Sequence, residues 1–389
     1  MQATNLRRMA AVAVGGALAL SLAACGSSSN NSPSGSGTTG GTDWASAQSA
    51  AAGGGMDALI AAAKKEGALN VIALPPTWAN YGYLISTFTK KYGIKITSEN
   101  PNGSSGDEMN ALASTKGQAS APDVVDVGNS YALTGATSGA FAPYKVATWN
   151  DIPATYKDAG GLWYADYGGY ISIGCKAAAV GGKCPTTLKA LDNPAYKGKV
   201  ALDGNPTSAN AAFEAVFAAA LANGGSATNI APGIAFFKKL NSEGIFNKTG
   251  ATQATIQSGA TPIVVDWDYL NSSAAGALKK ANVTWTVTIP SDGLVSNYYD
   301  QAINVNAPHP AAARLWEEFL YSQAADAGQN GFMAGFARPI ELPAMLKNGS
   351  GLNAHFLAPV TDANPFNPTP AQVTTAKNAV TAGWSAAVQ

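Results

Sequence analysis

The chain has 389 residues, 46% of them hydrophobic, and its formal net charge at neutral pH is zero. This hydrophobic fraction is typical of globular proteins and argues against a disordered chain. Arg7 and Arg8 lie in an N-terminal apolar segment, so the remainder of the chain carries 22 basic and 24 acidic residues. This slight acidic excess argues against nucleic acid as the main ligand. Beyond that segment the only arginines are Arg314 and Arg338, so an anionic ligand is also disfavoured.

The N-terminal segment combines a basic start, an apolar run over 9–24 and the tetrapeptide Leu22-Ala-Ala-Cys25. This order predicts a secretory signal. The run is shorter than the about 20 apolar residues that span a bilayer. The cysteine makes the segment resemble a bacterial lipoprotein signal, and the resemblance implies that 1–25 are signal peptide and lipobox and that Cys25 carries lipid. The alternative is an ordinary signal peptide with a chance cysteine. The predicted location is extracytoplasmic, anchored on the periplasmic or outer face of the cell membrane.

Residues 26–56 are mainly Gly, Ser, Thr, Asn and Ala, with Asp43 as the single charge. This composition predicts a flexible tether with a reach of roughly 30 Å. The two remaining cysteines, Cys175 and Cys184, are an even pair in an oxidising compartment. They predict a disulfide, with two free buried thiols as the alternative.

From residue 57 the pattern alternates between helix and strand. We predict helices over 57–67 and 83–92 and a third that follows residues 104–108 and ends at about 115, with strands over 69–74, 94–97 and 124–127. This order is typical of an α/β unit with a largely parallel sheet. Further strands are expected at 171–173, 199–202, 263–265, 283–289 and 302–305, and further helices at 209–222, 232–241 and 310–322, with a last helix in the C-terminal tail.

Several motifs make the chain similar to the extracellular solute-binding proteins of ABC importers, in the group that includes polyamine and ferric-iron binders. They include Ala-Pro-Asp-Val-Val-Asp-Val-Gly at 121–128 and Tyr-Lys-Gly-Lys-Val-Ala-Leu at 196–202, with others at 63–71, 88–96, 289–293 and 307–322. The resemblance implies an α/β, two-lobed type-II periplasmic-binding-protein fold, each lobe a mostly parallel sheet flanked by helices. It implies a monomer that delivers a small solute to membrane permease subunits without catalysis, cofactor or metal.

The implied domains follow the order of the elements. Residues 57–165 with 301–345 form lobe 1, and residues 166–300 form lobe 2, with the solute enclosed between them. Residues 346–389 form a C-terminal helical segment that the sequence assigns to neither lobe.

Ligand-binding residues in such folds lie on loops at strand ends. The candidates are Trp78, Ser130, Tyr131, Tyr167, Asp203, Trp267, Asp268, Tyr298 and Asp300. Aromatic rings beside carboxylates suit an organic cation. Polyamine-binding members resemble this chain at Trp267, Tyr298, Asp300 and Asp203, although the run Asp266-Trp-Asp-Tyr269 departs from their pattern. We therefore expect a cationic amine such as a polyamine.

Structural roles compete with these assignments. Trp267 could pack within a lobe, Asp300 could cap a turn or pair with a lysine, and Asp203 before Gly204 is a turn signal. Ferric iron, a sugar or a phosphonate-type solute is an alternative ligand, and a surface adhesin is an alternative class. An enzyme is disfavoured, because the chain has two histidines, His309 and His355, and lacks a Gly-x-Ser-x-Gly elbow, a phosphate loop and a dinucleotide fingerprint.

Overall fold

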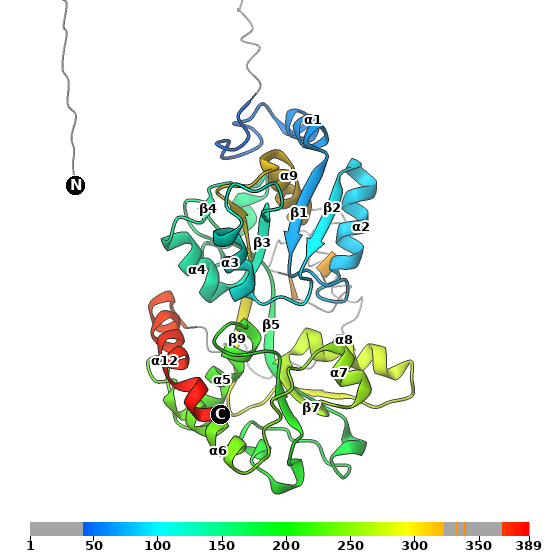
Figure 1. The fold of residues 1–389 in the computed structure, drawn as a ribbon, viewed down its shortest axis with the longest axis vertical. Helices are drawn as coiled ribbons and strands as arrows, with labels where there is room; N and C mark the ends of the chain where they lie inside the picture. Colours follow the sequence, from blue (N-terminus) through cyan, green and yellow to red (C-terminus); the bar gives the residue numbers. More distant parts are fainter. Residues whose placement is uncertain (1–41, 323–330, 333–337, 340–367, 389) are drawn as a thin grey trace, which may run out of the picture. The chain divides into compact units, whose positions relative to one another are not determined.

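The computed structural model describes residues 42–322, 331–332, 338–339 and 368–388 (Figure 1). The predicted signal and lipobox at 1–25 lie outside the described residues, as do residues 26–41 of the predicted tether. Within the part described, no helix is long and apolar enough to cross a membrane.

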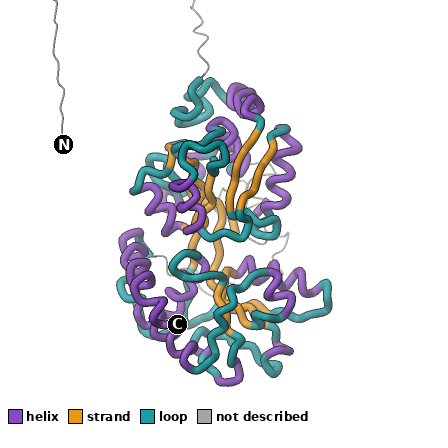
Figure 2. The backbone as a smooth tube through the Cα atoms, viewed as in Figure 1, coloured by secondary structure: helices purple, strands orange, loops and turns teal. Residues whose placement is uncertain are grey.

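Most predicted helices and strands occur with small shifts at their ends (Figure 2). The helices are α1 (Met56–Glu66), α2 (Tyr81–Tyr92), α3 (Ser105–Ser114), α4 (Asn129–Thr137), α5 (Asn210–Ala222), α6 (Ala231–Ser242), α7 (Gln253–Ser258), α8 (Asp268–Lys279), α9 (Pro310–Leu320) and α12 (Pro370–Val388). The strands are β1 (Ala68–Ile72), β2 (Lys95–Glu99), β3 (Val124–Gly128), β4 (Phe141–Ala142), β5 (Tyr164–Cys175), β6 (Val200–Leu202), β7 (Ile263–Trp267), β8 (Thr286–Thr288), β9 (Ser296–Asn304) and β10 (Arg338–Pro339). β5 and β9 begin well before the predicted strands, and α4, α7 and α8 were not predicted. Gly67 and Gly93 adopt left-handed backbone conformations that end α1 and α2, as glycine does after a helix.

Strands β5 and β9 are longer than the sequence predicts. The run 164–170 of β5 contains Gly168 and Gly169, and glycine is a weak strand former, so the pattern indicated a loop. The structure requires both glycines. A Cβ at Gly168 would lie 2.5 Å from the Asn297 carbonyl oxygen, and one at Gly169 would lie 2.5 Å from the Asp268 carboxylate.

The sheets confirm the α/β class but correct the expectation of mostly parallel pairing. β1 pairs with β2 in parallel, and β6 pairs with β7 in parallel. The path β3-β9-β5-β7 is antiparallel throughout, and β4, β8 and β10 add antiparallel pairs. The physical reason is that β5 leads the chain from the elements before it to the elements β6–β8, and β9 leads it back. The two strands therefore run in opposite directions and pair antiparallel.

These two strands join the groups (Figure 1). Residues 164–170 of β5 pair with β9, and residues 171–175 pair with β7. β9 in turn pairs with β3 through residues 299–303. The first group holds β1–β4, α1–α4 and α9, and the second holds β6–β8 and α5–α8. The C-terminal helix α12 packs against α6 and α5 of the second group and reaches α4 of the first.

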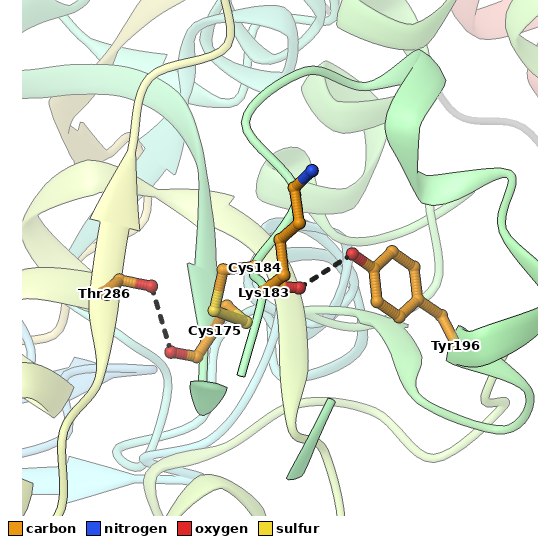
Figure 3. Close-up of a disulfide and its surroundings, with 5 residues drawn as sticks. All are labelled: Cys175, Lys183, Cys184, Tyr196 and Thr286. Carbon is orange, nitrogen blue, oxygen red and sulfur yellow. Dashed lines mark hydrogen bonds between the residues drawn. A yellow bond between two sulfur atoms is a disulfide. The ribbon is translucent and has the colours of Figure 1, made fainter. Parts of the chain in front are cut away.

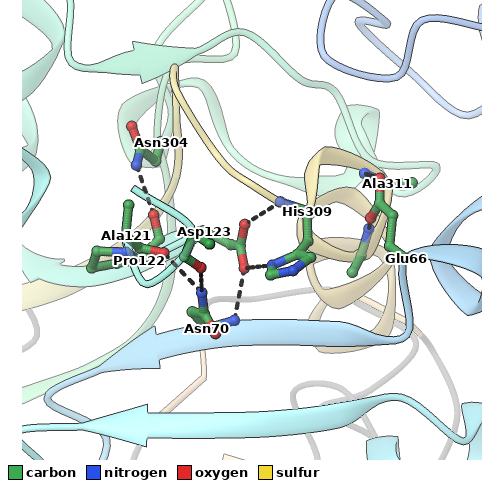
Figure 4. Close-up of polar contacts among 10 residues, drawn as sticks. Glu66, Asn70, Ala121, Pro122, Asp123, Asn304, His309 and Ala311 are labelled. Carbon is green, nitrogen blue, oxygen red and sulfur yellow. Dashed lines mark hydrogen bonds and ion pairs between the residues drawn. The ribbon is translucent and has the colours of Figure 1, made fainter. Parts of the chain in front are cut away.

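A polar network fastens the first group (Figure 4). The buried Asp123 carboxylate accepts hydrogen bonds from the Asn70 amide (2.7 Å) and the His309 amide (2.6 Å), and its Oδ2 lies 2.9 Å from His309 Nδ1. Glu66 accepts the amides of Ala311 (3.0 Å) and Ala312 (2.7 Å). A carboxylate thereby satisfies two free N–H groups at the start of α9, where negative charge is favoured.

Residues 42–55, which the sequence assigns to the flexible tether, are packed against α9. Trp44, Ala47 and Ala50 are buried. The buried guanidinium of Arg314 donates from Nε to the Ala47 carbonyl (2.8 Å) and from Nη2 to the Ala45 carbonyl (2.8 Å). The sequence concealed this contact because the segment's small residues are held by an arginine some 270 positions later.

Cys175 and Cys184 form the predicted disulfide, with their Cα atoms 5.9 Å apart (Figure 3). It closes the loop after β5. The loop is held further by Tyr196, whose hydroxyl donates to the Lys183 carbonyl (3.0 Å), and by Thr286, whose hydroxyl donates to the Cys175 carbonyl (3.2 Å).

Candidate functional site

A cavity of about 190 Å³ is lined by residues of β3, β7 and β9 and of the loop after β6, together with the loops after β1 and β2. This volume is below the about 300 Å³ at which pockets for drug-sized ligands begin, so it suits a small solute. The lining residues used below are Trp78, Glu108, Asp126, Asp203, Asp266 and Tyr299. They come from both groups of elements.

Four of the lining residues are acidic, and no lysine, arginine or histidine is among the described residues that line the cavity. Burial raises the pKa of Asp126 to about 7 and that of Asp203 to about 7. Burial also raises the pKa values of Asp266 and Glu108 well above their usual range, and the neighbouring charges of Asp203 and Asp126 respectively add to this effect. A cationic solute would stabilise the ionised forms of all four groups.

Asp126 is held in a fixed orientation in the middle of β3. Its Oδ2 accepts hydrogen bonds from the hydroxyls of Tyr81 (2.7 Å) and Tyr167 (2.9 Å), and these bonds partly oppose the burial effect on its pKa. Its backbone amide donates to Glu108 Oε2 (3.0 Å). Its buried Oδ1 has no hydrogen-bond partner among the described residues. Asp126 therefore presents a preoriented acceptor at the cavity wall.

Aromatic rings surround the same wall. The Trp78 ring meets Tyr299 edge-on at 5.5 Å and Tyr269 at 6.1 Å, and its indole N–H donates to the Tyr167 hydroxyl. Tyr167 stacks on Tyr299 with centroids 5.6 Å apart and planes 3° apart. Trp78 is half-buried, whereas the tyrosines are buried. Trp78 and Tyr299 therefore offer aromatic surface to a cation in the cavity.

Of the nine sequence candidates, Trp78 and Asp203 line the cavity. Tyr167 lies behind the wall and orients Asp126. The remaining six are not among the lining residues, and the structure places each of them in other contacts.

Four of these six have buried or half-buried partners. Trp267 and Asp268 are fully buried, and Asp268 Oδ1 accepts the Tyr170 amide (2.9 Å). Tyr298 donates to the Tyr156 hydroxyl (2.8 Å). Asp300 Oδ2 accepts from the Asn129 side chain (2.9 Å), so its partner is an amide and not the lysine considered from sequence.

Ser130 and Tyr131 lie at the start of α4 and contact the second group. Ser130 Oγ donates to the Asn210 side-chain oxygen (3.2 Å), and the Tyr131 hydroxyl donates to the Thr207 carbonyl (3.1 Å). They join the two walls of the cavity without lining it.

Sequence reasoning missed Glu108, Asp126, Asp266 and Tyr299. Asp266 and Tyr299 are chain neighbours of the candidates Trp267 and Tyr298, and successive side chains of a strand point to opposite faces. A one-residue difference therefore exchanges a lining residue for a packing residue. The signal for Asp126 was its position in the otherwise apolar strand Val124-Val-Asp-Val, where an unpaired carboxylate is costly.

Within the described ranges, no group of three or more His, Cys, Asp or Glu residues is placed to hold a metal ion.

The fold is that of the periplasmic binding proteins. The structural alignment with a periplasmic binding protein named P5PA covers 83% of this chain and 100% of that protein, with a TM-score of 0.65 and 17% sequence identity. AfuA from Actinobacillus pleuropneumoniae, solved with fructose-6-phosphate, covers 82% of this chain and 99% of its own (TM-score 0.63, 17% identity). The alignment with a periplasmic thiamin-binding protein covers 83% of this chain and 96% of that protein (TM-score 0.63, 15% sequence identity).

The family model for bacterial extracellular solute-binding proteins matches residues 120–367, and the chain belongs to this family. No curated protein sequence matches the chain significantly. The protein is accordingly an extracytoplasmic solute-binding protein of the kind that serves ABC importers, and not an enzyme. The bound molecules named for the similar structures differ widely, so the solute has to be inferred from the cavity of this chain.

Proposed function

We propose that the protein captures a small cationic amine, a polyamine in the first instance, and delivers it to an ABC permease from a lipid anchor on Cys25. The observation that carries the choice of solute is the cavity wall with four acidic and no basic described residues. Burying an ionised carboxylate without a partner costs several kcal/mol, and an ammonium group held by it offsets that cost. Trp78 and Tyr299 add aromatic faces for the same cation.

Other solutes fit this wall less well. A sugar phosphate or a phosphonate would find no basic side chain among the described lining residues to pair with its negative charge, and that charge would oppose ionisation of the acidic groups. Ferric iron would need a ligand group of the kind that the described residues lack. A similar structure from Listeria monocytogenes is assigned to a spermidine/putrescine ABC transporter, but at 14% identity it supports only the fold.

The two groups of elements are proposed to act as lobes, residues 57–165 with 301–345 on one side and 166–300 on the other. β5 and β9 would then form the hinge, because they are the paired strands that run between the groups. The packing of α12 on α5 and α6 supports assigning this helix to the second lobe. The protein is proposed to act as a monomer.

A thermal-shift comparison of the purified protein tests the choice of solute. Ligand at about 100 times its dissociation constant stabilises by about 2.7 kcal/mol, which corresponds to roughly 5–10 °C for a chain of this size. Putrescine and spermidine should raise the melting temperature, and 1,4-butanediol, which has putrescine's carbon chain without its charges, should not. A shift with fructose-6-phosphate and none with any amine would overturn the cationic assignment. No shift with any solute would favour an adhesin.

The anchor is tested separately. Cys25→Ser should move the protein from the membrane fraction to the soluble fraction and abolish fatty-acid labelling. An unchanged membrane fraction would remove Cys25 as the anchor without affecting the choice of solute.

A further inference from the structure

The two walls of the cavity meet at one side, where the first turns of α3 and α4 contact the segment 207–210. Three hydrogen bonds cross this contact, two from Ser130 and Tyr131 as described above and one from the Gly106 amide to the Ser208 carbonyl (3.1 Å). Gly128 permits the approach, because a Cβ there would lie 2.1 Å from Cγ of Asn210. The two segments therefore pack closely and are joined by specific hydrogen bonds, and this contact lies outside the strands β5 and β9.

The C-terminal helix adds a charged side chain to this contact. Nζ of Lys377 on α12 lies 3.1 Å from the centroid of the Tyr131 ring, a cation–π arrangement. Glu214, buried on α5, is the countercharge near Lys377. Burial lowers the pKa of Lys377 to about 8, and Glu214 opposes that shift. A half-buried lysine is thus retained beside an aromatic ring of the opposite wall.

The C-terminal half of α12 packs against aromatic residues of the second group. Trp384 packs edge-on against Phe237 at 5.6 Å and against Phe246 at 6.1 Å. Because this end of the helix is fixed, Lys377 is presented to Tyr131 from a rigid element. Tyr131 thereby touches two parts of the second group at once, Thr207 with its hydroxyl and Lys377 with its ring.

We propose that Tyr131 and Lys377 form a closing latch that sets how readily the cavity opens. Neither residue lines the cavity, so the latch acts on the opening equilibrium and not on the solute itself. A latch that favours the closed form raises the apparent affinity for any solute bound there by the same factor. The inference rests on the proposed function only in that opening and closing admit and release the solute.

Hydrogen exchange of the full-length protein tests the latch without any solute. The Gly106 amide is a direct reporter, because it donates across the contact to Ser208. Tyr131→Phe removes the hydroxyl and keeps the ring, and Lys377→Met removes the charge and keeps most of the stem. Each should speed exchange at Gly106 and over 205–210 by about threefold to tenfold, as expected for one lost hydrogen bond or cation–π contact. Amides of β1 should exchange as in the wild type.

Two matched variants serve as controls. Tyr196→Phe removes another tyrosine–carbonyl bond, at Lys183, and Lys238→Met removes an exposed lysine from α6. Neither should change exchange at Gly106. The latch is refuted if Tyr131→Phe and Lys377→Met leave Gly106 at the wild-type rate, or if only one of them speeds it. Equal acceleration in β1 would also overturn it, because it would mean general destabilisation. Since no solute is added, a failure of amine binding leaves this result readable.

Discussion

The affinity for a cationic amine should increase steeply with pH around neutrality. Asp126 and Asp203 line the cavity, and burial raises the pKa of each to about 7. Below this value the unliganded groups are largely protonated, and an ammonium ion has to displace their protons. Above it the carboxylates are ionised and available for charge pairing.

The magnitude follows from the ionised fraction. For a group with a pKa of about 7, this fraction falls from roughly 90% at about pH 8 to roughly 10% at about pH 6. Putrescine binding should therefore weaken by roughly tenfold if one of the two groups must ionise, and by up to roughly a hundredfold if both must. The amine itself stays charged over this range, since amines titrate near pH 10.

Isothermal titration calorimetry at about pH 6, 7 and 8 measures the effect. Repeating the titration at about pH 7 in two buffers of different ionisation enthalpy reports the protons released. Because each group is about half protonated at this pH, about half a proton is expected per amine bound if one group ionises, and about one proton if both do. Asp126→Asn should weaken binding and flatten the pH dependence, whereas Asp57→Asn, an exposed acid on α1, should do neither. Constant affinity between pH 6 and 8, or tighter binding at the lower pH, would show that these carboxylates do not hold the ligand.

Three further predictions concern stability. Arg314→Met should lower the free energy of unfolding by about 2–4 kcal/mol, because the carbonyls of residues 45 and 47 lose a charged donor. It should also expose residues 42–55 to protease, and unchanged proteolysis of that segment would show that Arg314 does not hold it. Replacing Cys175 and Cys184 by serine should cost about 2–3 kcal/mol in denaturant unfolding for so short a loop, and a midpoint equal to the wild type would count against a formed disulfide. The hydrogen bond to Asp123 raises the pKa of His309, so its contribution should be complete below about pH 6.5 and lost as the pH rises through the folded value. The melting-temperature advantage of the wild type over His309→Gln should accordingly be larger at about pH 6 than at about pH 9, and a constant difference would exclude a charged His309.

Local chemistry determined much of this protein. The helix ends at Gly67 and Gly93 follow from the left-handed backbone that glycine adopts without strain, and the periodic apolar residues placed most elements within a few positions. The order of the motifs indicated the solute-binding family, which the family model confirms. These features depend on residues close together in the chain, so sequence reasoning reaches them.

The identity of the wall depended on tertiary structure. In β7 the cavity is lined by Asp266 and not by its neighbour Trp267, and in β9 by Tyr299 and not by Tyr298. Which side of a strand faces the cavity depends on how the strand packs. The sequence of a strand buried on both faces does not reveal that side. The hydrogen bonds of Ser130 and Tyr131 to residues 207–210 join two segments some 80 positions apart, and such an approach is a property of the tertiary structure. The placement of Lys377 on Tyr131 and of Arg314 on residues 45 and 47 was likewise decided by long-range packing, which no local propensity encodes.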